Sequence, residues 1–359
     1  DGEVRRMGGA FGGKESQAAA IACLASVFAS RNGRPAKYRL ARQDDMVQTG
    51  KRHDFWNRYR VGFNDQGLIS GVEMHLAGMC GCTADLSEGI VDRAMFHADN
   101  AYFYPSVMIK GFRCKTNTVS NTAFRGFGGP KGMMAAESML DDIARSVRRD
   151  PLDVRYENLY REGRDTTPYG QKIDQHILLP MMKKLEADCG YRARKVEIFQ
   201  FNESNKFFRK GLALTPVKFG ISFTAKHLNQ AGALIHLYTD GSVHLNHGGT
   251  AMGQGLYTKI MQVVADTLGI NQERIIVSAA RTDKVPNTSP TAASAGTDLN
   301  GMAAKNAAEI IKRRLFDFIV EAFEVSFESI QLKADKFFFA QKEWAFEEII
   351  SQAYLSRVS

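Results

Sequence analysis

The chain has 359 residues, of which 44% are hydrophobic and 24% are charged. This length suggests two domains, and the composition is that of a globular chain able to bury a sizeable core. No apolar run approaches the roughly 18 residues of a membrane span, and the first residues lack the apolar segment of a signal peptide. We therefore expect a soluble protein without a membrane partner.

Charge and cysteine content indicate which ligands, partners and redox compartment to expect. The 47 Lys and Arg exceed the 39 Asp and Glu, which gives a net charge of +8. A solvated basic surface is the favoured explanation, and attraction for an anionic ligand is the second. The basic residues lack an aromatic-rich recognition motif, so we expect no nucleic-acid partner. The 5 cysteines are sparse and odd in number, which favours a reducing cytoplasm over a disulfide framework.

The first section of the chain contains a glycine-rich loop, Gly8–Gly13, followed by a predicted helix at Ser16–Ala29. This helix is apolar on most faces, so we expect it to be buried. A short strand is predicted at Lys37–Leu40. Two further strands, Arg58–Phe63 and Leu68–Leu76, flank a turn signal and predict a β-hairpin.

Helices dominate the next section, beginning with one predicted at Ser87–Phe96. A second glycine loop, Asn121–Pro130, precedes a helix at Gly132–Val147. An Asp-Pro pair, suited to the N-cap and the first position of a helix, then introduces Leu152–Tyr160. The stretch Asp174–Lys206 is also rich in helix-forming residues.

The second half is richer in strands, and it repeats the pattern of a loop followed by a helix. Its predicted elements, in chain order, are a strand-rich stretch at Gly211–Thr224, a hairpin of Ala233–Tyr238 and Ser242–Asn246, a loop at 247–255, a helix at Leu256–Leu268, a loop at 288–297, a helix at Gly301–Val320, a strand at Ile330–Ala340 and a helix at Trp344–Leu355. Hairpins interleaved with single helices favour an α+β fold over a doubly wound parallel sheet.

Loop-to-helix junctions are the main functional signal of the sequence. Four loops, at residues 8–13, 121–130, 247–255 and 288–297, are rich in Gly or in Ser and Thr and precede apolar helices. Helix N-termini and glycine loops offer free backbone N–H groups to an anion. None of the loops matches a Walker loop or a dinucleotide-binding fingerprint. They predict one extended anionic ligand, and the alternative is a set of tight turns with good helix caps.

Five motifs give the chain a family resemblance. They are RRMGGAFGGKE, NTAFRGFGGP, KFGISFT, HGGTAMGQG and PNTSPTAAS. In this order and at these spacings they resemble the molybdenum hydroxylase family, in particular the molybdopterin-binding portion of its purine-hydroxylating members. The resemblance runs from Arg5 to about Thr297, and more loosely to Ser359.

The resemblance implies an α+β fold with two tandem molybdopterin-binding domains, each built of layered mixed sheets and helices. We expect a first domain at residues 1–175, truncated at its N-terminus, and a helical connection at 176–210. The second domain would occupy residues 211–359 and be truncated at its C-terminus.

A molybdenum–molybdopterin cofactor is the ligand that the resemblance implies, and it agrees with the anionic ligand expected from the loops. The residues next to the metal would be Phe11, Arg125 and Ala293, which would contribute mainly backbone groups. The residues that bind the pterin and its phosphate would be Gly12, Met252, Gly253, Gln254, Thr291, Ser294 and Thr297.

The resemblance also implies a substrate, because the family hydroxylates a carbon next to nitrogen or oxygen. Phe127 and Phe223 would sandwich a flat purine ring, Glu15 and Arg93 would address its polar edges, and Thr224 could add a hydrogen bond. Aldehyde oxidases usually have apolar or neutral residues in place of this acid and base, so the pair favours xanthine or hypoxanthine. An aldehyde oxidase-like hydroxylase is the alternative. Without the resemblance, both side chains would be read as structural.

Several parts of such an enzyme are not found in the sequence. The family's general base, a glutamate in a Gly-Glu-Pro stretch, is expected beyond Ser359, so no catalytic residue is assigned within the chain. No cysteine pattern for [2Fe–2S] clusters and no flavin domain is recognised. The resemblance implies that these cofactors lie on other domains or subunits of an oligomeric cytoplasmic enzyme. We expect the chain alone to be inactive and to retain the cofactor poorly. A non-catalytic cofactor-binding or assembly module is the third hypothesis.

Overall fold

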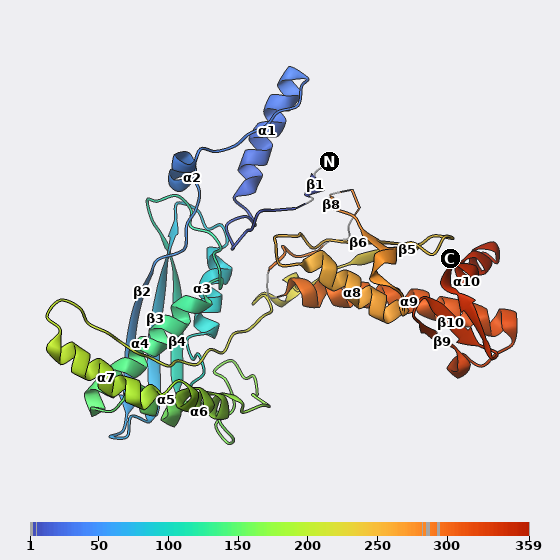
Figure 1. Ribbon diagram of the computed structural model, residues 1–359. Helices are drawn as coiled ribbons and strands as arrows, with labels where there is room; N and C mark the ends of the chain where they lie inside the picture. Colours follow the sequence, from blue (N-terminus) through green and yellow to red (C-terminus); the bar gives the residue numbers. More distant parts are fainter. Residues whose placement is uncertain (1–2, 5, 282, 285–287, 293–294, 359) are drawn as a thin grey trace. The chain divides into compact units, whose positions relative to one another are not determined.

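The computed structural model describes residues 3–4, 6–281, 283–284, 288–292 and 295–358 (Figure 1). The chain divides into two compact units. The N-terminal unit is Phe11–Gly220, and the C-terminal unit combines Asp1–Ala10 with Ile221–Ser359. The chain passes from one unit to the other within the first glycine loop. The connection predicted at residues 176–210 is helical and lies inside the N-terminal unit.

A mixed three-stranded sheet forms the centre of the N-terminal unit. Strand β2 (Phe55–Phe63) pairs antiparallel with β3 (Ile69–Gly81), and β3 pairs parallel with β4 (Val107–Lys115). In this register Met74 lies opposite Tyr59 on one side and Ile109 on the other. The predicted hairpin is therefore confirmed, although β3 continues well beyond Leu76.

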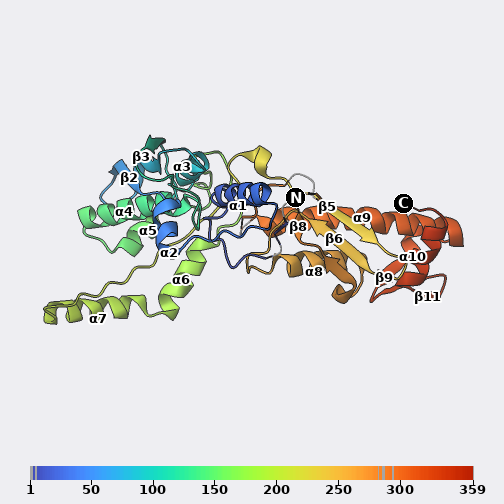
Figure 2. The same cartoon turned by 90° about the horizontal axis from the view of Figure 1, so that it is seen from above.

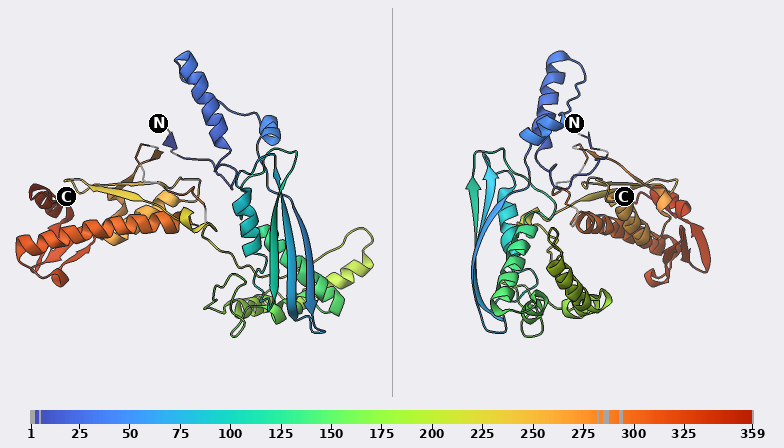
Figure 3. Two further views of the ribbon diagram at one scale, coloured as in Figure 1. Left: turned by 180° about the vertical axis from the view of Figure 1, so that it is seen from behind. Right: turned by 60° about the vertical axis from the view of Figure 1, so that its left-hand side comes forward.

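Two helices cover one face of this sheet. They are α3 (Ser87–Phe96), at the bounds predicted for it, and α4 (Gly129–Val147), and they lie side by side along the strands (Figures 1 and 3). Helix α4 places Met139, Leu140 and Ile143 on its buried face, the spacing expected of an amphipathic helix. The same packing buries the alternate residues of β3 on the helix side of the sheet.

Three further helices complete this part of the unit: α5 (Pro151–Asn158), α6 (Leu178–Asp188) and α7 (Tyr191–Ser204). The predicted cap is confirmed, because the Asp150 side chain accepts a 2.8 Å hydrogen bond from the backbone N–H of Leu152.

The segment before the sheet differs from the prediction in two respects. Helix α1 (Ala18–Asn32) forms, followed by α2 (Arg42–Gln48), but none of the α1 residues is buried. Leu24 and Phe28 on α1 are 49% and 60% exposed, since no described element covers the helix. Lys37–Leu40 is also not a strand, because no described strand pairs with it.

A second mixed sheet organises the C-terminal unit. Strand β5 (Ala233–Leu237) pairs antiparallel with β6 (Val243–His247), which confirms the predicted hairpin. Strand β6 then pairs parallel with β7 (Ile275–Val277). Helices α8 (Leu256–Leu268) and α9 (Gly296–Phe323) pack against each other and against this sheet (Figure 2). Helix α9 begins earlier than the predicted start at Gly301.

The remaining elements of this unit are short. They comprise β1 (Glu3–Val4) paired with β8 (Ala280–Arg281), the 3-10 turns η1 (Lys226–Leu228), η2 (Gln272–Arg274) and η3 (Phe327–Ser329), the antiparallel strands β9 (Gln331–Lys333), β10 (Lys336–Phe339) and β11 (Lys342–Ala345), and helix α10 (Phe346–Leu355). The single strand predicted at Ile330–Ala340 is wrong, since Ala334 and Asp335 both adopt positive φ and turn the chain into a hairpin.

The predicted strand section at Gly211–Thr224 is wrong as well. The segment contains no strand, and side chains rather than a ladder hold part of its backbone. Both units nevertheless combine mixed sheets with helices, which confirms the predicted α+β class. In the described ranges, no helix combines the length and the apolar character needed to cross a bilayer.

One buried side chain fixes the β2–β3 turn onto α5. Asn158 Oδ1 accepts from the backbone N–H of Ile69 at 2.9 Å, and Asn158 Nδ2 donates to the carbonyl of Gly67 at 2.8 Å. Replacing Asn158 with Ala leaves these two backbone groups buried without a partner. We expect the free energy of unfolding, measured by urea denaturation, to fall by about 2–4 kcal/mol. The exposed Asn117→Ala control should change it by less than about 0.5 kcal/mol. Equal effects would contradict this role.

Candidate functional site

The first two glycine loops are in contact within the N-terminal unit. Gly12 has φ +101°, and a Cβ atom there would lie 2.5 Å from Phe124 Cα. Only glycine can adopt this conformation at this distance without strain. Phe11 next to it is 67% exposed, and Arg125 next to Phe124 is exposed as well. The fold therefore places two of the residues predicted next to the metal on adjoining loops.

Arg93 and Phe127 are brought together by α3 and the second loop. Arg93 is only 5% exposed, and its guanidinium carbon lies 5.9 Å from the centre of the Phe127 ring and 5.2 Å from that of Phe219. Both distances are in the range of cation–π interactions. Burial lowers the pKa of Arg93 from its ordinary value, and the guanidinium remains charged at neutral pH. The unit thus holds a fixed, largely desolvated cation against two aromatic faces.

Glu15 lies just past the first loop and keeps contact with solvent. Partial desolvation, with a smaller contribution from Asp85, raises the pKa of Glu15 from its ordinary value of 4.5. Among the described residues Glu15 forms no ion pair. Its carboxylate therefore lies just after the loop and forms no salt bridge with a described residue.

The third and fourth loops are in contact within the C-terminal unit. The backbone N–H of Thr250 donates to Thr291 Oγ1 at 2.9 Å. Gln254 folds back over the third loop: its Oε1 accepts from the N–H of Met252 at 2.6 Å, and its Nε2 donates to the carbonyl of Thr250 at 3.1 Å. Gly253, between them, has φ +98° and open space where a Cβ would stand. Four of the predicted cofactor residues thus belong to one connected pair of loops.

The other predicted residues of this unit lie outside the third loop. Thr297 lies in the first turn of α9, because this helix begins at Gly296. Ala293 and Ser294 lie outside the described residues. Phe223 is held by a pair of hydrogen bonds with Asn229, at 2.8 and 2.9 Å, and Thr224 follows it in the same turn.

The hydrogen-bond donors of the third and fourth loops suit an anionic ligand that is held mainly by backbone groups. Gly253 and Gly255 both have positive φ and open space beside them, so a ligand can approach the main chain. The buried Ser289 Oγ has no hydrogen-bond partner among the described residues. Buried polar groups in folded proteins almost always have a hydrogen-bond partner. A polar, anionic pterin fits these neutral donors. Within the described ranges, no group of three His, Cys, Asp or Glu side chains could hold a metal ion.

Sequence patterns did not single out several residues that support the site. Arg52 donates to the carbonyl of Arg125 at 3.0 Å and lies 4.5 Å from the centre of the Phe124 ring. Lys131 follows the second loop, and burial lowers its pKa to about 8. His97 is the C-cap residue of α3, four residues after Arg93, and this spacing was the signal that could have found it.

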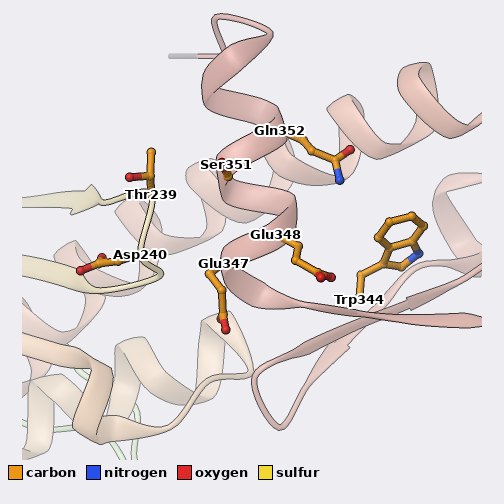
Figure 4. Close-up of a pocket in the computed structure, with 7 residues that line it drawn as sticks. All are labelled: Thr239, Asp240, Trp344, Glu347, Glu348, Ser351 and Gln352. Carbon is orange, nitrogen blue, oxygen red and sulfur yellow. The ribbon is translucent and has the colours of Figure 1, made fainter.

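A pocket elsewhere in the C-terminal unit contains none of the predicted residues. It lies between the β5–β6 turn and α10, and its lining residues are Thr239, Asp240, Trp344, Glu347, Glu348, Ser351 and Gln352 (Figure 4). Its acidic lining does not suit an anionic cofactor, so the paired loops remain the candidate site.

Two family models, both described as molybdopterin cofactor-binding domains, match residues 2–159 and 184–359. They define the class of the chain as a tandem pair of such domains and confirm the predicted cofactor. A xanthine dehydrogenase/oxidase of Gallus gallus is 50% identical over 312 residues, which cover 87% of this chain and 23% of the relative. The chain belongs to the molybdenum hydroxylase family that includes the xanthine dehydrogenases.

Other relatives broaden this comparison. A nicotinate hydroxylase of Emericella nidulans is 46% identical over 314 residues, which cover 87% of this chain and 23% of that protein. The crystal structure of quinoline 2-oxidoreductase from Pseudomonas putida 86 superposes with a TM-score of 0.84 at 21% identity, over 99% of this chain and 47% of the other. The last likeness supports the fold alone. The chain spans about a quarter of the length of the curated relatives it matches.

Gly12 and Gly13 offer a matched test of the contact between the first two loops. Gly12→Ala would force a left-handed residue and an overlap with the Phe124 backbone, whereas Gly13 has open space and no positive φ. We expect Gly12→Ala to lower the free energy of unfolding by about 3 kcal/mol. Gly13→Ala should change it by less than about 0.5 kcal/mol. Urea denaturation measures both, and similar losses would contradict the close approach.

Buried histidines predict how stability depends on pH. Burial lowers the pKa of His53, His97 and His247 from 6.5 to about 4. Between these values the unfolded chain binds more protons than the folded chain, so stability falls as the pH drops from about 6.5 to about 4. Each histidine should remove about 1 kcal/mol by pH 5.5.

The measurement is urea denaturation at several pH values for the parent chain and for His53→Gln. The loss of stability below pH 6.5 should be smaller in this variant than in the parent. Replacing the exposed His227 with Gln is the control, and it should leave the pH dependence unchanged. A His53→Gln curve parallel to that of the parent would contradict the prediction.

Proposed function

We propose that this chain is the molybdopterin-binding part of a xanthine dehydrogenase-type enzyme that hydroxylates hypoxanthine and xanthine to urate. The 50% identity to the avian relative named for xanthine supports this substrate class. The relatives are about four times longer than the matched region, since it makes up 23–25% of their length. The reaction therefore belongs to a larger enzyme, in which this chain supplies cofactor and substrate contacts.

The buried guanidinium of Arg93 is the observation that carries the purine assignment. It is 5% exposed and lies against the rings of Phe127 and Phe219. Negative charge develops on a purine ring as oxygen adds to it, and a preorganised cation stabilises such charge most where water is excluded. By the family resemblance, aldehyde oxidases usually have an apolar or neutral residue at this position, so an aldehyde does not require this cation.

The other predicted substrate residues extend this arrangement. Phe127 and Phe223 would hold the flat ring by face and edge contacts. Glu15, whose pKa is raised, could exchange a proton with a ring nitrogen at the opposite polar edge. Thr224 would add a hydrogen bond.

The cofactor would be held mainly by main-chain groups. Gly12, Met252, Gly253, Gln254, Thr291, Ser294 and Thr297 would contact the pterin and its phosphate, with Phe11, Arg125 and Ala293 next to the metal. When bound, the cofactor supplies the redox-active metal centre at which the substrate carbon is oxidised. The chain's own contribution is to orient both partners and to place charge beside the substrate.

Further parts of the enzyme follow from the same assignment. We propose that [2Fe–2S] clusters and FAD on other domains or subunits carry electrons away from the molybdenum centre. The complete enzyme would be an oligomer in the cytoplasm. Its substrate is a small molecule, and we propose neither a nucleic-acid nor a membrane partner.

Nicotinate is a second candidate substrate, because the relative named for it is 46% identical over nearly the same share of the chain. Its carboxylate would also pair with a buried arginine. An aldehyde oxidase-like hydroxylase and a non-catalytic assembly module complete the alternatives. Steady-state kcat/KM values for xanthine, nicotinate and a neutral aldehyde, measured on the holoenzyme that contains this chain, distinguish the three substrates. Cofactor binding without turnover would indicate the assembly module.

Replacing Arg93 tests the proposed substrate role. In the holoenzyme, Arg93→Gln should lower kcat/KM for xanthine by about 100-fold, because the developing charge loses its cation. Turnover of a neutral aldehyde and the molybdenum content should stay unchanged. Arg113→Gln removes a more exposed arginine that is paired with Asp92, and it should leave both activities unchanged. Equal xanthine kcat/KM in Arg93→Gln and in the parent would refute the purine assignment.

A further inference from the structure

The N-terminal unit ends in a segment that forms neither helix nor strand, residues 216–220, which we call the strap. Side chains just after α3 hold its first half. Asn100 Nδ2 donates to the carbonyl of Pro216 at 3.0 Å, and Asn100 Oδ1 accepts from the N–H of Lys218 at 3.1 Å. The Lys218 ammonium pairs with the buried carboxylate of Asp99. The strap is thus fixed by specific hydrogen bonds rather than by a ladder.

His97 holds the last residue of the strap. Its Nε2 accepts a 3.0 Å hydrogen bond from the N–H of Gly220, and its Nδ1 lies 2.8 Å from the carbonyl oxygen of Arg93. Since the Nε2 atom accepts, the ring proton belongs on Nδ1, which donates to that carbonyl. The side chain of Arg93 in turn donates to the carbonyl of Gly220. Three residues therefore form one closed ring of hydrogen bonds.

An aromatic residue of the strap, Phe219, packs against two members of this ring. The centre of the Phe219 ring is 4.9 Å from that of His97 and 5.2 Å from the Arg93 guanidinium carbon. A Cβ atom on Gly129 would lie 2.9 Å from Phe219, so the glycine at the start of α4 leaves room for this ring. Phe219 can occupy this position only while the strap lies along α3.

We propose that His97 is a positioning residue for Arg93, which it fixes by holding Gly220 and Phe219 of the strap against α3. An arginine side chain loses rotamer entropy when it is fixed, and a bound carbonyl and a ring face restrict it before substrate arrives. The inference rests on the proposed function only for the part that Arg93 plays toward a purine. The hydrogen-bond ring itself does not depend on it.

Two substitutions of His97 separate its two hydrogen bonds. The amide of Gln reaches the position of Nε2 and can still accept from Gly220, whereas the shorter Asn reaches only the position of Nδ1. In the holoenzyme we expect His97→Asn to lower kcat/KM for xanthine by about 10-fold, because a misplaced binding group costs rate. We expect His97→Gln to stay within about threefold of the parent, and aldehyde turnover to be unchanged in both.

The decisive measurement is a double-mutant cycle with Arg93→Gln. If His97 acts through Arg93, His97→Asn should cause no further loss of xanthine kcat/KM in the Arg93→Gln background. His53→Asn is the matched control, since His53 is also buried and contacts Ser87 rather than the strap. It should lower the melting temperature without changing xanthine kcat/KM.

Each outcome decides between the two proposals. A His97→Asn loss that is just as large in the Arg93→Gln background, or an equal loss in His97→Gln, overturns the positioning role. Unchanged xanthine turnover in Arg93→Gln alone overturns the proposed substrate instead. In that case a crystal structure of the His97→Asn holoenzyme still tests the inference. The Arg93 guanidinium should have left the Gly220 carbonyl, and an undisturbed guanidinium rejects the positioning role.

Discussion

The close approach of Gly12 to the backbone of Phe124 is the constraint on which the paired loops of the N-terminal unit depend. A 2.5 Å distance to a Cβ that is not there, at φ +101°, leaves no residue but glycine. This contact joins the loop that carries Phe11 to the loop that carries Arg125. Residues more than a hundred positions apart in the chain thereby become neighbours.

In the C-terminal unit, hydrogen bonds rather than a close backbone approach join the two loops. Thr250 and Thr291 connect its two loops, and Gln254 closes the first of them on itself. These contacts leave open space beside the backbone of Gly253 and Gly255, and the buried Ser289 hydroxyl has no hydrogen-bond partner among the described residues. The two units differ in charge. Arg93, the desolvated cation among the predicted site residues, lies on α3 in the N-terminal unit. Main-chain donors would thus serve the cofactor, and a fixed charge would serve the substrate.

Much of the fold could be predicted because local signals agree with the tertiary environment. Helices α3 and α8 have the predicted bounds, and the two hairpins and the cap of Asp150 follow from turn and capping chemistry. The failures have a common cause. Lys37–Leu40 and Gly211–Thr224 contain β-forming residues but form no strand, because a strand also needs a partner that no local pattern supplies. The exposure of α1 likewise depends on what packs against it rather than on its composition.

By itself the sequence determined which loops could receive an anionic cofactor, since glycine content, helix starts and motif order are properties of the chain. The family resemblance then singled out Arg93 and Glu15, which without it would be read as structural residues. Only the tertiary structure decided that the loops meet in pairs, that Arg93 is buried against two aromatic rings, and that His97 and Gly220 form hydrogen bonds beside it. These three features depend on contacts between distant segments. A hydrogen bond such as that from Gly220 to His97 produces no periodic pattern in the sequence.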